Sequence, residues 1–280
     1  MAEVMTAQFG LRQEWTHFAE SHRLFLERYP NLQLELETAF IRTGTTSEPV
    51  DRLVFFGGRL CAEDFMEILL LCGNGYGLGA MKILRGMYER VVPGRYLHAH
   101  SEETEAFFDF YWVSLYKLSR AIREKFGEAA VPMDKFEETQ TNYHKVGERF
   151  MVSDCKECGT KRPNYTWSKL DFVSMAYATG PTGDRIVDAY YIPTQYAHST
   201  VAAILARLRE GTGGGVTFDA GPQRSMADVA LISAHNLMLN VLDLQKEHFK
   251  LDALEKPLEQ CCRDFQDIWK RKGEDQKENV

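Results

Sequence analysis

The residues that could do chemistry begin with Arg85 and Glu89, which are four positions apart, and Tyr96, which follows seven positions later. At about 100° per residue these spacings place all three side chains along one edge of a helix, beside an apolar face that includes Leu84. A guanidinium held by a carboxylate presents a planar fork of N–H donors that fits a phosphate or a carboxylate. The alternative is an ordinary surface ion pair, worth about 0.3 kcal/mol.

A second candidate, His198, lies in the segment DAYYIPTQYAHSTVAAILARL. We expect one helix over 184–209, with Pro193 as a kink or as its true start, and His198 on an apolar face with Thr194. Tyr190 points in nearly the same direction if the helix continues through Pro193. A buried histidine beside tyrosines could transfer a proton, or it could be a hydrogen-bonded core residue.

Cys155 and Cys158 form a CxxC turn, which is half of a zinc knuckle. Tetrahedral zinc needs four ligands, and the chain has no second CxxC pair. We therefore expect no cofactor, and these two cysteines remain the only zinc candidates.

The pair Arg95 and His100 has the R-x4-H spacing of HEPN-type ribonucleases, in which an arginine and a histidine act on an RNA phosphodiester. Arg12 and His17 have the same spacing. Chance alone produces such matches in a chain with this many arginines, so the spacing carries little information. A metal-independent ribonuclease or toxin that uses Arg95 and His100 stays open as an alternative.

The elements that would position these residues are almost all helical. We expect a single all-α domain over 1–272, an irregular bundle of about 8–10 helices, with a polar cysteine-containing insert at 152–166, a small hairpin near 215–222 and a disordered tail at 273–280. Pro93-Gly94 should kink or interrupt the central helix that begins near Gly77. The glycines of 73–79 are interpreted as a flexible turn rather than a nucleotide-binding loop, because helical sequence precedes them.

Composition limits the classes of function. A net charge of −7 argues against broad nonspecific binding to nucleic acid or to anionic lipid. The start of the chain has acids where a signal peptide has basic residues, and the longest apolar run, 68–72, is far shorter than the roughly 20 residues of a membrane span. Six cysteines without framework spacing indicate reduced thiols. We expect a cytoplasmic protein with no membrane partner.

The chain resembles a bacterial family of uncharacterised function, domain of unknown function 5677, over roughly residues 50–250. The resemblance is carried by ILRGMYER with Arg85 and Glu89, by Tyr96, by Trp167 near a short helix, and by TQYAHST, which contains Tyr196 and His198. Thr194 stands where the family pattern has a serine. The resemblance implies an all-helical cytoplasmic fold. A setting in phage defence or stress response follows only by analogy with other helical modules.

The resemblance also implies that several of these side chains meet in one interhelical polar pocket. The leading hypothesis is a pocket that binds an anionic small molecule or a nucleic-acid end. Arg85 would hold the anion, Glu89 would orient Arg85, and His198 would exchange a proton. The ligand-binding set is Arg85, Tyr96, Trp167, Tyr190 and Tyr196. Besides the ribonuclease, a non-catalytic protein that forms homodimers through its apolar helices remains an alternative.

Overall fold

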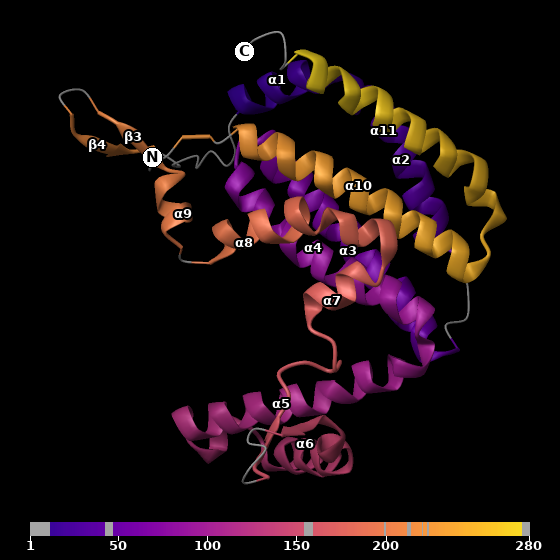
Figure 1. Cartoon of the computed structure of the whole chain (residues 1–280), viewed down its shortest axis with the longest axis vertical. Helices are drawn as coiled ribbons and strands as arrows, with labels where there is room; N and C mark the ends of the chain where they lie inside the picture. The colour runs from indigo at the N-terminus through magenta and orange to yellow at the C-terminus, as the bar shows by residue number, and fades with distance from the viewer. Residues whose placement is uncertain are drawn as a thin grey trace, which may run out of the picture. The chain divides into compact units, whose positions relative to one another are not determined.

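The computed structural model describes residues 12–42, 47–153, 159–198, 200–211, 214–219, 221–222 and 224–275. The chain divides into two compact units, a larger one of Met1–His98 with Ala176–Val280 and a smaller one of Ala99–Met175. Both are built from helices, which confirms the all-α prediction (Figure 1). Cooperative unfolding of 1–272 as one domain stays a prediction, which calorimetry would test.

The larger unit contains most of the α-helices. They are α1 (Arg12–Ser21), α2 (Arg23–Phe40), α3 (Pro49–Gly73), α4 (Gly77–Ala99), α8 (Ile192–Ala197), α9 (Val201–Leu205), α10 (Arg224–Phe249) and α11 (Glu255–Asp275). Of these helices, α8 and α9 are short. α11 extends past the predicted start of the tail, and 276–280 lie outside the described residues. Among the described helices, none combines the length and the apolar composition that a bilayer crossing requires.

The core of the larger unit lies mainly between α3 and α10, with α11 running alongside α10 and α2 (Figure 1). The fully buried side chains include Phe65 and Ile68 of α3, Leu84 and Met87 of α4, and Leu237 of α10. They recur at helical spacing on each element, so each helix turns one apolar face inward. On α10, Leu237, Val241 and Leu244 recur every three or four positions and form a buried apolar stripe.

At Gly58, α3 leaves room for side chains of α10 and α2. Gln245 of α10 is fully buried and donates from Nε2 to the main-chain oxygen of Val54 at 2.7 Å. A Cβ at Gly58 would lie 2.7 Å from the same Nε2 atom and 2.9 Å from the Phe40 ring. A larger residue at this position would therefore separate the two helices.

α4 starts after a turn in which Gly75 has φ 73°, a left-handed conformation that glycine adopts without strain. Of the kink or interruption expected at Pro93-Gly94, the interruption is wrong, because α4 continues through Pro93 to Ala99. A kink at this position stays a prediction. Pro93 and Gly94 are both buried. Packing on all sides therefore holds the helix together where proline removes one backbone hydrogen bond.

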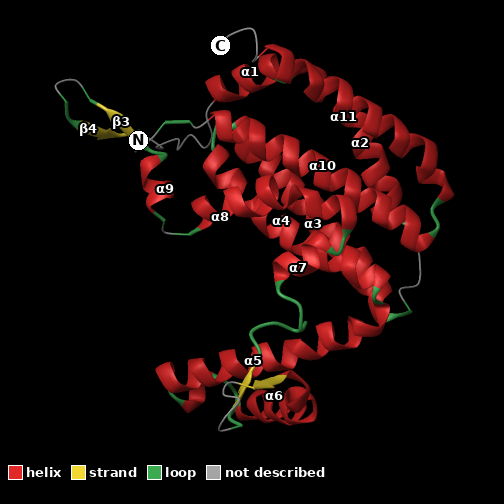
Figure 2. Ribbon diagram, in the orientation of Figure 1, coloured by secondary structure: helices red, strands yellow, loops and turns green. Residues whose placement is uncertain are grey.

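The smaller unit contains α5 (Thr104–Phe126), α6 (Met133–Val146) and the start of α7 (Phe172–Tyr177). α5 packs against α6, and the buried residues Ala106, Val113 and Phe150 form its core. β1 (Met151–Ser153) pairs antiparallel with β2 (Lys161–Pro163), and Figure 2 shows both in yellow. The sequence did not predict this pair. The pair begins at Met151, one residue before the polar insert predicted at 152–166, and ends inside that insert at Pro163.

The single helix expected over 184–209 is wrong. The chain there forms a 3₁₀ helix η4 (Gly180–Arg185), a π-helix η5 (Val187–Tyr191), α8, α9 and then β3 (Leu208–Glu210). Thr200 starts α9 anew, because its side-chain oxygen accepts from the Ala203 amide at 3.2 Å. β3 pairs antiparallel with β4 (Val216–Phe218), so the predicted hairpin exists, with its first strand lying before 215 (Figure 2).

Candidate functional site

Arg85 and Glu89 form an ion pair on one edge of α4. Arg85 Nη2 donates to Glu89 Oε1 at 2.9 Å, and the two side chains are 19% and 40% exposed. The neighbouring Leu84 and Tyr88 are fully buried. The pair therefore lies at the boundary between the core and solvent, as the periodicity predicts.

His198 contacts the same guanidinium from a distant part of the chain. Arg85 Nη1 lies 2.5 Å from His198 Nε2, and the imidazole is exposed. A guanidinium is always protonated and has no lone pair, so Nη1 donates and Nε2 accepts. The neutral ring then carries its proton on Nδ1. The expected placement of His198 on an apolar helix face is wrong, because α8 ends at Ala197 and the ring lies at the surface.

Tyr190 supports the arginine from η5. Its ring centre lies 5.3 Å from Arg85 Cζ, within the range of a cation–π interaction, and 6.3 Å from the centre of the Tyr88 ring. Thr194 Oγ1 donates to the main-chain oxygen of Tyr190 at 2.6 Å. Three segments, α4, η5 and the end of α8, thus place Arg85, Tyr190 and His198 together.

A buried polar network anchors this group of segments to α10. Tyr88 OH donates to the main-chain oxygen of Thr182 at 3.0 Å, and Thr182 Oγ1 donates to Asn240 Oδ1 at 3.1 Å. Burial, reinforced by the nearby charge of Asp188, raises the pKa of Tyr88 well above its ordinary value, so its hydroxyl stays a donor.

Sequence reasoning missed this network, although one signal was present. Asn240 is a half-buried polar residue of α10 next to the buried Leu239 and Val241, and polar groups at such positions usually have hydrogen-bond partners. Asp188 itself pairs with Arg185 and accepts from Ser233 Oγ at 2.9 Å, which gives η5 a second attachment to α10.

The remaining predicted binding residues lie elsewhere. Tyr96 is buried, 5% exposed, and eleven positions after Arg85 on the same helix, which corresponds to about 16 Å along its axis. Tyr196 is half-buried on α8, two residues before His198. Trp167 belongs to the smaller unit. The structure therefore brings together Arg85, Glu89, Tyr190 and His198, and their roles stay predictions.

Trp167 lines a cavity within the smaller unit. The cavity has a volume of about 420 Å³, and its wall includes Glu102, Arg149, Phe150, Asn164, Trp167 and Lys169. The Trp167 ring packs edge-on against Phe107 at 5.4 Å between centres. Arg149 Nη1 forms an ion pair with Asp109 Oδ2 at 3.0 Å. This volume lies within the usual range of small-molecule sites.

Arg95 and His100 have different surroundings. Arg95 Nη2 contacts Asp243 at 2.6 Å and the Asn240 main-chain oxygen at 2.8 Å, and Nη1 contacts Glu247 at 2.7 Å. His100 Nδ1 lies 3.5 Å from Glu102. These contacts use both terminal nitrogens of Arg95 to hold α4 on α10, which favours a structural role over phosphate binding.

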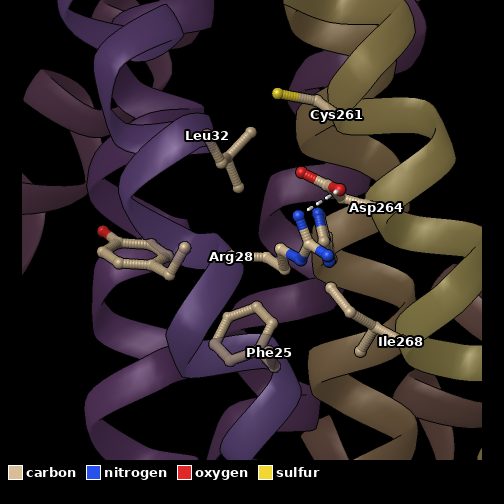
Figure 3. Close-up of a pocket in the computed structure, with 8 residues that line it drawn as sticks. Phe25, Arg28, Leu32, Cys261, Asp264 and Ile268 are labelled. Atoms are coloured by element: carbon tan, nitrogen blue, oxygen red, sulfur yellow. Dashed lines mark ion pairs between the residues drawn. The ribbon is translucent and has the colours of Figure 1, made fainter.

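Metal chemistry gives no further candidate among the described residues. Cys155 and Cys158 lie outside them, and within them no three His, Cys, Asp or Glu side chains are grouped to hold a metal ion. A small enclosed cavity of about 10 Å³ between α2 and α11 is lined by Arg28 and Asp264, whose ion pair Figure 3 shows. It has room for about one water molecule.

Comparisons with known proteins agree with the resemblance in sequence. No curated protein and no solved structure gives a significant match to the chain. One family model matches residues 60–215, a range that includes α4, η5, α8 and the whole Arg85–His198 contact. That range exceeds half of the chain, and the chain therefore belongs to DUF5677, a family of unknown function.

Proposed function

We propose that this protein binds an anionic group at the contact between Arg85 and His198. The group is a phosphate or a carboxylate, carried by a small molecule or by the end of a nucleic acid. The observation that carries this proposal is the 2.5 Å contact between Arg85 Nη1 and His198 Nε2, two nitrogen groups from remote segments that meet at the protein surface.

The arginine is pre-oriented for this role. Glu89 fixes Nη2, and the Tyr190 ring lies beneath the guanidinium, so Nη1 is directed toward His198. Arg85 Nε is buried and has no hydrogen-bond partner among the described residues. Arg95 Nε and Arg185 Nε share this state, so the buried donor supports a ligand site only together with the exposed Arg85–His198 contact.

The chemistry of the contact favours exchange with an anion. A neutral imidazole nitrogen is a weaker partner for a guanidinium than a phosphate or carboxylate oxygen, because only the oxyanion adds the attraction between two opposite full charges to the hydrogen bond. An anion would therefore take the place of Nε2 on Nη1. The released, exposed His198 ring can take a proton from solvent on Nε2 and then donate that proton to the same anion. In this arrangement Arg85 holds the ligand, Glu89 orients Arg85, and His198 exchanges the proton.

Binding should be measured by titration calorimetry with inorganic phosphate, a nucleoside monophosphate and a 5′-phosphorylated oligonucleotide. Arg85→Ala should abolish binding. Arg90→Ala is the matched control, because Arg90 lies on the same helix and pairs with Asp64. The proposal fails if the wild-type protein binds none of the three probes. It also fails if Arg85→Ala binds as tightly as Arg90→Ala.

A further inference from the structure

The second face of α3, opposite its core contact with α10, leaves large apolar side chains in solvent. Phe56 is 54% exposed, Leu60 47%, Met66 41% and Leu70 55%. Scattered apolar residues are normal on a protein surface, but four on one helix within four turns form a contiguous patch of the kind that marks an interaction site.

The exposed residues of α3 have the spacing of a coiled-coil seam. Steps of four and three alternate along the stripe that consists of Arg52, Phe56, Arg59, Glu63, Met66 and Leu70. An alternation of four and three is a 3.5-residue repeat, which keeps one face of a helix directed toward a partner helix along its whole length. Three of these six residues are charged, so the spacing by itself shows only that one exposed face continues along α3, on which Phe56, Met66 and Leu70 supply the apolar contacts for a partner helix.

Charge identifies the partner. The stripe carries arginines in its first half and Glu63 in its second. Its midpoint along the helix is at the level of Cys61, which itself faces the core. An antiparallel second copy of α3, related by a two-fold axis beside Cys61, places Arg59 opposite Glu63 of the second copy, and Glu63 opposite its Arg59. The same axis places Phe56 opposite Met66. A parallel copy would instead place Arg59 against Arg59, which is repulsive.

The side chains are available for these contacts. Within one chain the Arg59–Glu63 pair is long, at 3.8 Å, and its members are 52% and 60% exposed, so the pair contributes little to the isolated protein. Met66 is held in place by Tyr29, whose hydroxyl lies 3.0 Å from its sulfur. Beside the stripe, α2 and α3 form an open groove of about 510 Å³ into which the edge of a partner helix can pack.

We propose that the protein forms a homodimer in which α3 packs against α3 of a second copy in antiparallel orientation. The Arg59–Glu63 pairs form the central layers and the Phe56–Met66 pairs flank them. This arrangement is isologous, so it closes as a dimer and leaves no free stripe.

Sedimentation equilibrium of the full chain tests the proposal with charge reversal. In the Arg59→Glu dimer, each of the two pairs between positions 59 and 63 consists of two acids. In the Glu63→Arg dimer, each of these pairs consists of two bases. Each single variant should raise the dimer Kd by at least about tenfold. The control is Arg23→Glu, which reverses one member of a comparable exposed i,i+4 pair with Glu27 on α2 and should leave the Kd unchanged.

Restoration separates this geometry from a general loss of stability. An equimolar mixture of the Arg59→Glu and Glu63→Arg proteins should form a heterodimer, and the chain that carries both substitutions should again form a homodimer. A wild-type protein that stays monomeric would overturn the proposal. The proposal would also be overturned if the single charge reversals left the dimer Kd unchanged. It would be overturned as well if neither the mixture of the two variants nor the double variant formed dimers again.

Discussion

Arg85 Nη1 donates to His198 Nε2 at 2.5 Å, although 113 positions separate the two residues in the chain. The contact forms because η5 and α8 fold back on α4 and are fixed there by the buried bond from Tyr88 to Thr182. The position of the imidazole therefore depends on the packing of a whole segment, whereas the arginine depends only on its own helix.

The first prediction concerns the residue that orients Arg85. Glu89→Gln keeps a hydrogen-bond acceptor but removes the charge that fixes Nη2, so Arg85 should lose part of its preferred orientation. Affinity for the anionic probe that the wild-type protein binds should fall about 3- to 10-fold, less than the complete loss expected for Arg85→Ala. Calorimetry provides the measurement. An affinity equal to that of the wild type would show that Glu89 has no positioning role.

The second prediction uses two adjacent glycines of α3. Gly58→Ala should lower the free energy of unfolding by about 1–3 kcal/mol, because its Cβ would overlap Gln245 and Phe40. A Cβ at Gly57 meets nothing within 4 Å, so Gly57→Ala should raise stability by about 0.5–1 kcal/mol through helix propensity. Urea denaturation compares the two proteins. Equal effects of the two substitutions would contradict the close approach of α3 and α10.

The third prediction concerns pH. Burial lowers the pKa of His235 from 6.5 to about 4, and Trp269 Nε1 donates to its Nδ1 at 3.2 Å. The unfolded chain therefore takes up a proton at a higher pH than the folded chain. The contribution of His235 to the free energy of unfolding is fully present above pH 6.5 and is lost as the pH falls from 6.5 to about 4. The total loss is about 3 kcal/mol.

In the His235→Gln variant the glutamine side chain does not take up a proton, so the variant should not show this pH-dependent loss of stability. The readout is the difference in free energy of unfolding between wild type and variant at each pH. Taking the difference cancels Asp64, whose pKa burial raises to about 6 and whose contribution has the opposite sign. A difference that stays constant between pH 7 and pH 4 would contradict the neutral, buried state of His235.

The fourth prediction separates structure from catalysis at Arg95. Arg95→Gln should lower the free energy of unfolding by about 1–2 kcal/mol, because Asp243 and Glu247 lose their shared partner. If the protein is incubated with total RNA, any cleavage should survive both Arg95→Gln and His100→Ala. Cleavage that either substitution abolishes would instead favour the ribonuclease alternative.

Much of the fold follows from periodicity. The stripe of α10 and the edge position of Arg85 on α4 are both visible in the sequence, because a helix that buries one face repeats its apolar residues every three or four positions. The prediction of one helix over 184–209 is wrong for an identifiable reason. Thr200 is a good N-cap residue inside a stretch that otherwise scores as continuous helix, and His198 consequently lies at the exposed end of α8.

Other features depend on tertiary packing and have no local signal. Pro93 predicts a break, but the burial of its neighbours maintains α4. β1 and β2 are only three residues long and form beside the packed α5–α6 core. The Arg85–His198 contact could be proposed from family resemblance, yet no spacing rule connects residues so far apart.

The π-helix η5 fixes the direction in which His198 faces. A π-helical turn contains one residue more than an α-helical turn, and such turns are commonly found at functional sites. Deleting one residue between Val187 and Tyr191 would convert it to an ordinary turn and rotate everything up to Ala197 by about 100°. The imidazole would then swing away from the guanidinium while α4 kept its place. The extra residue in the π-helical turn therefore determines how α8 is rotated relative to α4.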